Sequence, residues 1–249
     1  MKALITGASS GIGAAIARVF TQHSHEVILL ARREEKLKDL QKILGKKCHI
    51  IACDITDTQA IQAALEAPAY QNIDVLINNA GKALGLSSAD SANIADWEEM
   101  VEVNILGLIK LTHLLLPKMI AQGGGHIINI GSIAGSYPYP GGNVYGASKA
   151  FVRQFSLNLR ADLYDKNIRI SNIEPGLCGG SEFSLVRFKG DKTKADEVYK
   201  DTTPLMPEDI AQSVFWVANL PKHVNINTLE IMPTTQAPAA LNVYKRVKK

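Results

Sequence analysis

The sequence predicts an α/β fold, a doubly wound parallel sheet of about seven strands with helices on both faces, in three layers. The first observation is the alternation of short apolar runs with longer stretches of helical periodicity along the whole chain. The second is a glycine-rich turn at residues 7–13, between the first apolar run and the first helical stretch. The predicted strands cover residues 3–6, 27–30, 49–52, 74–77, 126–130, 168–173 and 228–232.

The predicted helices follow from apolar residues that recur with the period of a helix. Gly45 ends one of these stretches and Pro68 ends another, as expected for residues that terminate helices. The predicted helices cover about 14–20, 34–44, 58–67, 94–121, 143–163 and 208–219. Because strands and helices alternate throughout, we expect residues 1–249 to form one domain.

Composition and charge limit the classes of protein that fit. The chain has 249 residues, of which 46% are hydrophobic and 20% charged, as in soluble globular proteins. A net charge of +3 favours binding to neither nucleic acid nor a membrane. Three cysteines without the spacing of metal ligands indicate a reducing compartment, so we expect a cytoplasmic protein with no metal site. We expect the basic end, residues 244–249, to be a solvated tail.

Residues 7–13 have the spacing Gly-x-x-x-Gly-x-Gly where the first strand meets the first helix. Glycines let the backbone approach a pyrophosphate, and the start of a helix offers free N–H groups. This spacing differs from the commoner Gly-x-Gly-x-x-Gly, so it predicts a variant dinucleotide site. The residues expected to hold the dinucleotide here are Gly7, Ser9, Ser10, Gly11, Ile12 and Gly13.

The end of the second strand indicates which dinucleotide binds. An acidic residue there would bind the ribose 2′-hydroxyl of NAD, whereas arginine suits the 2′-phosphate of NADP. The sequence has Arg32 and Arg33 at this position, so we predict NADP. The alternative is that both arginines pair with Glu34, Glu35 or Asp39 on the following helix.

Polar residues also follow the third and fourth strands. Asp54, in the pair Asp54-Ile55, could hold the edge of the adenine ring or cap the helix that begins near Thr56. Asn79 could brace neighbouring strand ends and line the cofactor cleft, or belong to a plain turn. Asn104 lies among apolar residues of the helix 94–121, so we expect it to be buried.

Three reactive side chains are expected at the same edge of the sheet. Ser132 follows the fifth strand, at the carboxyl edge where open α/β sheets bind their ligands. Tyr145 and Lys149 lie one turn apart on one face of the helix 143–163. A nearby ammonium lowers the pKa of a tyrosine, so the pair could act as a general acid and base. Taken alone, such a pair is more often two surface side chains.

The sixth strand leads into a long irregular connection. Residues 177–203 have only weak helical patches, and a connection of this length is usually functional, for example as a lid over an active site. Arg187 and Lys189 on this lid could bind the carboxylate of a substrate or be ordinary surface charges.

In their order along the chain, these motifs resemble the short-chain dehydrogenase/reductase family. The resemblance rests on residues 6–13, residues 78–81, Asn104, Ser132, Tyr145-x-x-x-Lys149 and Pro175-Gly176. It implies a Rossmann-like fold and a catalytic set of Ser132, Tyr145, Lys149 and Asn104, in which Lys149 also reaches the nicotinamide ribose and Asn104 positions a water. It further implies cofactor contacts from Asp54, Ile55, Asn79, Tyr145, Lys149, Pro175, Gly176, Cys178 and Ser181. Relatives often have a threonine soon after Pro-Gly, whereas here Ser181 is the nearest hydroxyl.

Residues 141–155, 182–191 and 223–230 resemble the NADP-dependent 3-hydroxy acid dehydrogenase branch of this family. Its members, usually homotetramers, act on L-allo-threonine, serine or 3-hydroxypropionate, or reduce malonic semialdehyde. The resemblance implies that hydride moves between NADP and the 3-hydroxyl carbon, while Ser132, Tyr145 and Arg187 bind the substrate. The alternatives are another carbonyl reductase of the family, such as a 3-oxoacyl carrier-protein reductase, or a non-catalytic NADP-binding scaffold. The physiological substrate, its stereochemistry and the preferred direction stay open.

Overall fold

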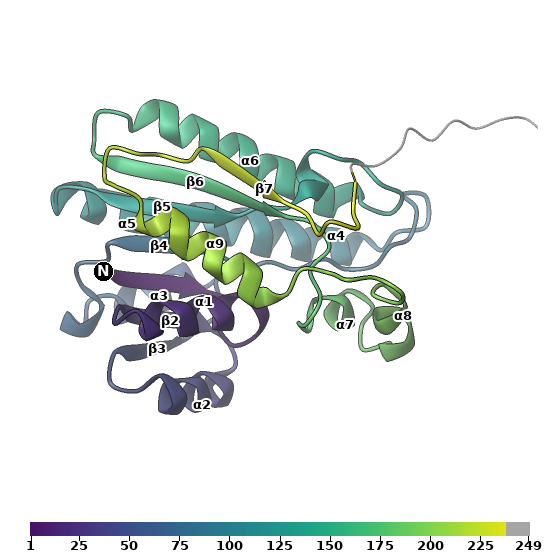
Figure 1. Ribbon diagram of the computed structural model, residues 1–249, viewed down its shortest axis with the longest axis horizontal. Helices are drawn as coiled ribbons and strands as arrows, with labels where there is room; N and C mark the ends of the chain where they lie inside the picture. The colour runs from purple at the N-terminus through teal and green to yellow at the C-terminus, as the bar shows by residue number, and fades with distance from the viewer. Residues whose placement is uncertain (238–249) are drawn as a thin grey trace, which may run out of the picture.

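The computed structural model describes residues 1–237, which contain a seven-stranded sheet in the order β3-β2-β1-β4-β5-β6-β7 (Figure 1). All neighbouring strands are parallel. The fold prediction is therefore confirmed, whereas the tail predicted at 244–249 lies outside the described residues. The strands are β1 (Lys2–Thr6), β2 (Glu26–Ala31), β3 (Cys48–Ala52), β4 (Val75–Asn78), β5 (Gly125–Ile130), β6 (Ile168–Pro175) and β7 (Thr228–Ile231).

The described helices agree with the predicted ones at most boundaries. The third ends at Ala64 instead of residue 67, because Ala67 precedes Pro68 and takes an extended conformation with ψ of 139°. Short 3-10 turns are η1 (Pro68–Tyr70) and η3 (Ile133–Gly135). The α-helices are α1 (Gly11–Gln22), α2 (Glu34–Leu44), α3 (Thr58–Ala64), α4 (Ile94–Val101), α5 (Leu108–Ala121), α6 (Asn143–Asp162), α7 (Phe183–Arg187), α8 (Lys192–Glu197) and α9 (Pro207–Asn219).

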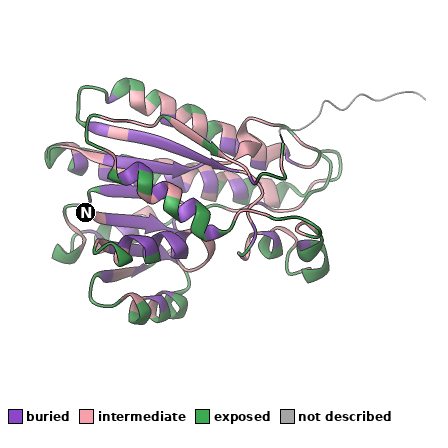
Figure 2. Cartoon of the chain, in the orientation of Figure 1, coloured by how far each residue is buried: buried purple, intermediate pink, exposed green. Residues whose placement is uncertain are grey.

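Two apolar clusters, one on each face of the sheet, hold the layers together. On one face, Phe20 of α1 and Val214 of α9 are fully buried against the strands. On the other face, Leu111 and Leu115 of α5 pack with Ile61 of α3. Figure 2 shows the strands buried between helices whose outer sides are exposed. The apolar runs within β1, β2 and β4 follow from this burial on both faces, as is usual for parallel sheets.

The predicted helix 94–121 is interrupted by a π-helical stretch, η2 (Glu102–Gly107), between α4 and α5. Residues 94–121 are long and apolar enough to cross a membrane by length and composition alone, and 39% of the most apolar window is buried. Core helices of soluble proteins have the same properties, and α5 is a core helix of this sheet. The π-helical stretch carries Asn104, and such stretches occur frequently at functional sites.

The carboxyl ends of the strands meet at one edge of the sheet, and the order of connection reverses between β1 and β4. Ligands of open α/β sheets bind outside the carboxyl ends at such a point. The helices α7 and α8 of the 177–203 segment extend beyond this edge (Figure 1). The predicted site residues that follow β1, β2, β4 and β5 lie at this edge.

Candidate active site

Tyr145 and Lys149 lie on the same buried face of α6. Their exposed fractions are 8% and 7%, and the Lys149 Nζ lies 5.9 Å from the centroid of the Tyr145 ring. The ammonium donates a hydrogen bond to the backbone carbonyl of Ile130, at 2.8 Å. Gly135 lets the turn after Ser132 approach α6, because a Cβ there would lie 2.7 Å from the Lys149 backbone carbonyl carbon. The structure thus brings Ser132, Tyr145 and Lys149 together, as predicted from their positions.

Burial dominates the ionisation of this pair. It raises the pKa of Tyr145 to about 12, while a hydrogen bond with Ser132 and the charge of Arg187 act in the opposite direction. Burial also lowers the pKa of Lys149 to about 8. The sequence predicted that Lys149 would lower the pKa of Tyr145. In the structure the nearby cation that does so is Arg187, because the Lys149 ammonium is directed toward the Ile130 carbonyl.

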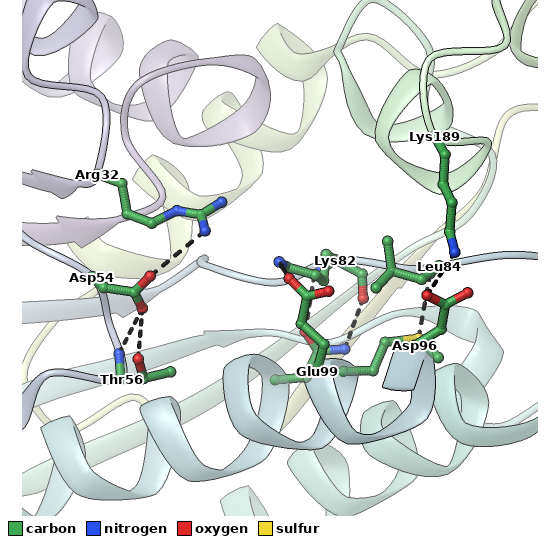
Figure 3. Close-up of polar contacts among 10 residues, drawn as sticks. Arg32, Asp54, Thr56, Lys82, Leu84, Asp96, Glu99 and Lys189 are labelled. Carbon is green, nitrogen blue, oxygen red and sulfur yellow. Dashed lines mark hydrogen bonds and ion pairs between the residues drawn. The ribbon is translucent and has the colours of Figure 1, made fainter. Parts of the chain in front are cut away.

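Arg187 reaches the active site from the end of α7. Its Nε donates to the Gly85 carbonyl at 3.1 Å, and its Nη2 donates to the Tyr139 hydroxyl at 2.9 Å. Its guanidinium carbon lies 5.7 Å from the centroid of the Tyr145 ring. Lys189, the other predicted candidate, instead forms an ion pair with Asp96 at 2.8 Å (Figure 3). Of the two lid residues predicted to bind a carboxylate, Arg187 is the one that lies against the predicted catalytic tyrosine.

Asn104 is buried, as expected, and all of its polar atoms are engaged. Its Oδ1 accepts from the Lys82 backbone N–H at 2.9 Å, and its Nδ2 donates to the Lys82 carbonyl at 2.9 Å and to the Ser148 hydroxyl at 3.0 Å. A Cβ at Gly81 would lie 3.3 Å from the Asn104 Oδ1 and 3.5 Å from the Lys149 Nζ. Asn104 therefore joins η2 to α6 and lies close to Lys149. Nothing in the sequence had indicated the contribution of Lys82 and Ser148.

The glycine-rich turn is shaped to receive a pyrophosphate. Gly7 has φ of +64°, and a Cβ at Gly13 would lie 2.6 Å from the Gly7 carbonyl oxygen. The Asn79 amide donates to the Thr6 carbonyl at 2.8 Å. Asn79 therefore braces the ends of β1 and β4, which was one of its predicted roles. Ser10 precedes α1 without capping it through its side chain. The first N–H groups of α1, including those of Gly11, Ile12 and Gly13, are therefore available to a ligand, and this cradle fits a dinucleotide.

The two arginines after β2 have different partners from those considered in the sequence. Arg32 forms an ion pair with Asp54 at 3.6 Å (Figure 3). Arg33 donates to the Ser9 hydroxyl at 3.0 Å and to the Ser10 hydroxyl at 2.8 Å. The alternative of pairing with the acidic residues of α2 is wrong, because lysines of the same helix pair with them.

Asp54 does not cap the following helix. Its carboxylate accepts from the backbone N–H of Thr56 at 2.9 Å and from the Thr56 hydroxyl at 2.8 Å, which forms a turn. The residue that caps α3 is Asp57, whose side chain accepts from the Ala60 N–H. The capping alternative for Asp54 was therefore wrong, since α3 begins at Thr58, as the predicted helix did, and Asp57 directly precedes it. Ile55 is buried against Gly107 of η2.

The segment after β6 faces the glycine-rich turn. The Pro175 carbonyl accepts from the Ser132 hydroxyl at 3.5 Å, and the Gly176 N–H donates to the Ile231 carbonyl at 2.7 Å. Ser181 lies over Gly11, where a Cβ would be 3.0 Å from that of Ser181. Cys178 pairs with Leu205 in an isolated β-bridge, and burial raises the pKa of its thiol to about 12. Its thiol is thus held in the neutral form.

Comparisons with known proteins agree with this geometry. The model of the short chain dehydrogenase family matches residues 1–186. The chain is 54% identical to the NADP-dependent 3-hydroxy acid dehydrogenase YdfG of Escherichia coli O6:H1, over 99% of this chain and 100% of that protein. It is 49% identical to the serine 3-dehydrogenase of Agrobacterium fabrum, over 97% of each chain.

Solved structures show the same relationship. A closed form of serine dehydrogenase complexed with NADP+ is 53% identical and superposes with a TM-score of 0.97, covering 99% of this chain and 100% of that one. The serine dehydrogenase from Escherichia coli is 47% identical with a TM-score of 0.85, covering 95% of this chain and 100% of that one. The motifs, the sheet order and these similarities lead to one conclusion: the chain belongs to the short chain dehydrogenase family.

Proposed function

We propose that this protein is an NADP-dependent oxidoreductase that moves hydride between the nicotinamide and the 3-hydroxyl carbon of a short 3-hydroxy acid. The observation that carries the proposal is the convergence of Ser132, Tyr145 and Lys149 with the cation of Arg187 beside the glycine-rich turn. The names of the close relatives, a 3-hydroxy acid dehydrogenase and a serine 3-dehydrogenase, support the same substrate class.

The proton chemistry belongs to Tyr145. Bound NADP supplies the nicotinamide carbon that gives or accepts hydride. With a pKa of about 12, the Tyr145 phenol carries its proton at neutral pH and can donate it to the carbonyl oxygen of a substrate. In the reverse direction the deprotonated Tyr145 phenolate takes the hydroxyl proton. Ser132 stabilises the substrate oxygen by hydrogen bonding, and Asn104, which is bonded to Lys82 and Ser148, positions a water that relays protons from Lys149.

Arg187 provides the charge that a hydroxy acid requires. Its Nε and Nη2 are held by Gly85 and Tyr139, which leaves Nη1 without an acceptor among residues 1–237. A carboxylate placed there would have its hydroxyl-bearing carbon near Tyr145. We expect Arg187→Met to raise the Michaelis constant for 3-hydroxypropionate by about tenfold or more. Lys189→Met, which removes a lid cation paired with Asp96, is the matched control and should leave it unchanged.

The substrate class can be tested directly by NADPH absorbance. The panel contains L-allo-threonine, L-serine, 3-hydroxypropionate, malonic semialdehyde and a 3-oxoacyl thioester, each with NADP(H) and NAD(H). The proposal expects turnover of the short acids with NADP(H) and little turnover of the thioester. Turnover of the thioester alone would identify a carrier-protein reductase. Tight NADPH binding without turnover of any compound would favour a non-catalytic scaffold.

We propose a homotetramer that works in the cytoplasm, with residues 1–249 as one domain and 177–203 as its lid. The aromatic rings of Phe151 and Phe155 stack along α6 with 5.6 Å between their centroids, and Phe151 is 36% exposed. An apolar helix face of this kind supports a subunit interface. The free thiols of Cys48, Cys53 and Cys178 support a reducing compartment. Light scattering after gel filtration tests the subunit number, and a fluorescent fusion tests the location.

A further inference from the structure

A carboxylate from the lid occupies the cationic cluster at the end of β2. Glu182, the residue before α7, places its Oε2 2.6 Å from the Arg33 Nη1 and its Oε1 2.6 Å from the Lys36 Nζ. The same guanidinium binds the hydroxyls of Ser9 and Ser10. A guanidinium, an ammonium and hydroxyls are the donors that bind a phosphate monoester. An acidic side chain of this chain therefore sits where the donors suited to an external phosphate converge.

We propose that Glu182 acts as an internal substitute for the 2′-phosphate of NADP and thereby sets the ratio of NADP affinity to NAD affinity. The inference rests on the proposed function, since it takes NADP as the cofactor. Glu182 and a 2′-phosphate require the same nitrogens of Arg33 and Lys36, and two anions cannot share them without repulsion. NAD has an uncharged 2′-hydroxyl, which can donate a hydrogen bond to a carboxylate at this position. Glu182 thus lowers the affinity for NADP relative to NAD, whereas the cations Arg33 and Lys36 favour NADP.

The displacement that NADP requires can be confined to the Glu182 side chain. The relative in a closed form with NADP+ has a backbone that superposes with a TM-score of 0.97 over 99% of this chain. The Glu182 side chain is 39% exposed, so it can turn toward solvent without disturbing the core. Lys36 and then Arg33 hold the pKa of its carboxyl at about 2, so it competes as an anion at neutral pH. Glu182 itself therefore keeps the same charge throughout the neutral pH range.

The size of the effect follows from two partly exposed ion pairs. Each such pair changes an equilibrium by about 1.4- to 5-fold. Glu182→Gln removes the charge but keeps the shape of the side chain. It should tighten binding of adenosine 2′,5′-bisphosphate, which carries the 2′-phosphate without the nicotinamide, by about 2- to 30-fold. The affinity for 5′-AMP, which carries a 2′-hydroxyl instead, should stay equal or fall.

Isothermal titration calorimetry of the full chain measures these affinities without turnover, for both probes and for NADP and NAD. Glu197→Gln is the matched control, because Glu197 lies on α8 of the same lid and pairs with Lys200, at 3.3 Å. Glu182→Asp retains the charge and should resemble the wild type more closely than Glu182→Gln does. An increase in the NADP-to-NAD affinity ratio that is confined to Glu182→Gln supports the inference.

Two results would overturn it, and a third would refute the proposed function. The 2′,5′-bisphosphate could bind Glu182→Gln with unchanged affinity, or more weakly, which would mean that Glu182 orients Arg33 for the phosphate. Both probes could bind Glu182→Gln more tightly by the same factor, which would indicate only a general loss of negative charge. A wild-type protein that binds neither NADP nor the 2′,5′-bisphosphate would instead refute the proposed function. The two failures are therefore distinguishable.

Discussion

Lys149 should make the stability of this protein depend on pH in a direction opposite to that of an ordinary surface lysine. Burial lowers its pKa from 10.5 to about 8. Between these values the unfolded chain binds more protons than the folded one, so the free energy of unfolding rises with pH. Each pH unit is worth about 1.4 kcal/mol, so below pH 8 the buried ammonium destabilises the fold by about 3 kcal/mol. About 2 kcal/mol of this should be recovered between pH 7 and 9.5.

The perturbation that exposes this effect is Lys149→Met, which keeps the length of the side chain and removes the charge. Urea denaturation, followed by circular dichroism at equal protein concentration from pH 7 to 9.5, gives the free energy of unfolding of each protein. The wild type should gain about 2 kcal/mol relative to Lys149→Met over this range. Lys110→Met, which removes an exposed ammonium on α5, is the control. Its free energy of unfolding should change with pH as that of the wild type does. If the free energies of unfolding of the wild type and Lys149→Met changed equally with pH, the ammonium would not be desolvated in the way that its burial indicates.

Three further predictions concern the site. Tyr145→Phe should lower kcat by about 10²- to 10⁴-fold in an NADPH absorbance assay while leaving the urea midpoint near that of the wild type; retention of most of the turnover would refute the acid–base role. Asn104→Leu should lower the free energy of unfolding by about 1–3 kcal/mol, because the Ser148 hydroxyl and both Lys82 backbone groups lose a partner, and an unchanged urea midpoint would contradict this. Arg33→Ala should weaken NADP by about tenfold or more and NAD far less in calorimetry, and an equal loss for both would exclude a contact with the 2′-phosphate.

Much of the architecture could be predicted because its causes are local. Strands such as β2 and β4, which are buried on both faces, contain continuous apolar runs, and each helix repeats its apolar residues with the period of a helix. The spacing of four residues between Tyr145 and Lys149 places them on one helix face whatever the rest of the fold is. The position of Ser132 just after a strand likewise predicts the edge of the sheet at which it lies.

The lid contacts could not be predicted because their partners are far apart in sequence. Glu182 meets Arg33 across 149 residues and Lys36 across 146 residues. Arg187 meets Gly85 across 102 residues. Periodicity carries no information about such pairs, since the path of an irregular segment depends on packing and not on local propensity. For this reason the sequence offered acidic residues of α2 only as the alternative protein partners of Arg33, whereas the structure shows Glu182.

The ionisation of the catalytic pair also depends on the tertiary structure. The sequence by itself determined that a tyrosine and a lysine share one face of a helix, in a chain that begins with a nucleotide-binding turn. Only the fold decided that both are buried, that Arg187 lies over the Tyr145 ring and that Lys149 is directed to the Ile130 carbonyl. The physical reason is that a pKa responds to desolvation and to charges within a few ångströms. Both are properties of the assembled structure, which brings α6, α7 and the end of β5 to one place.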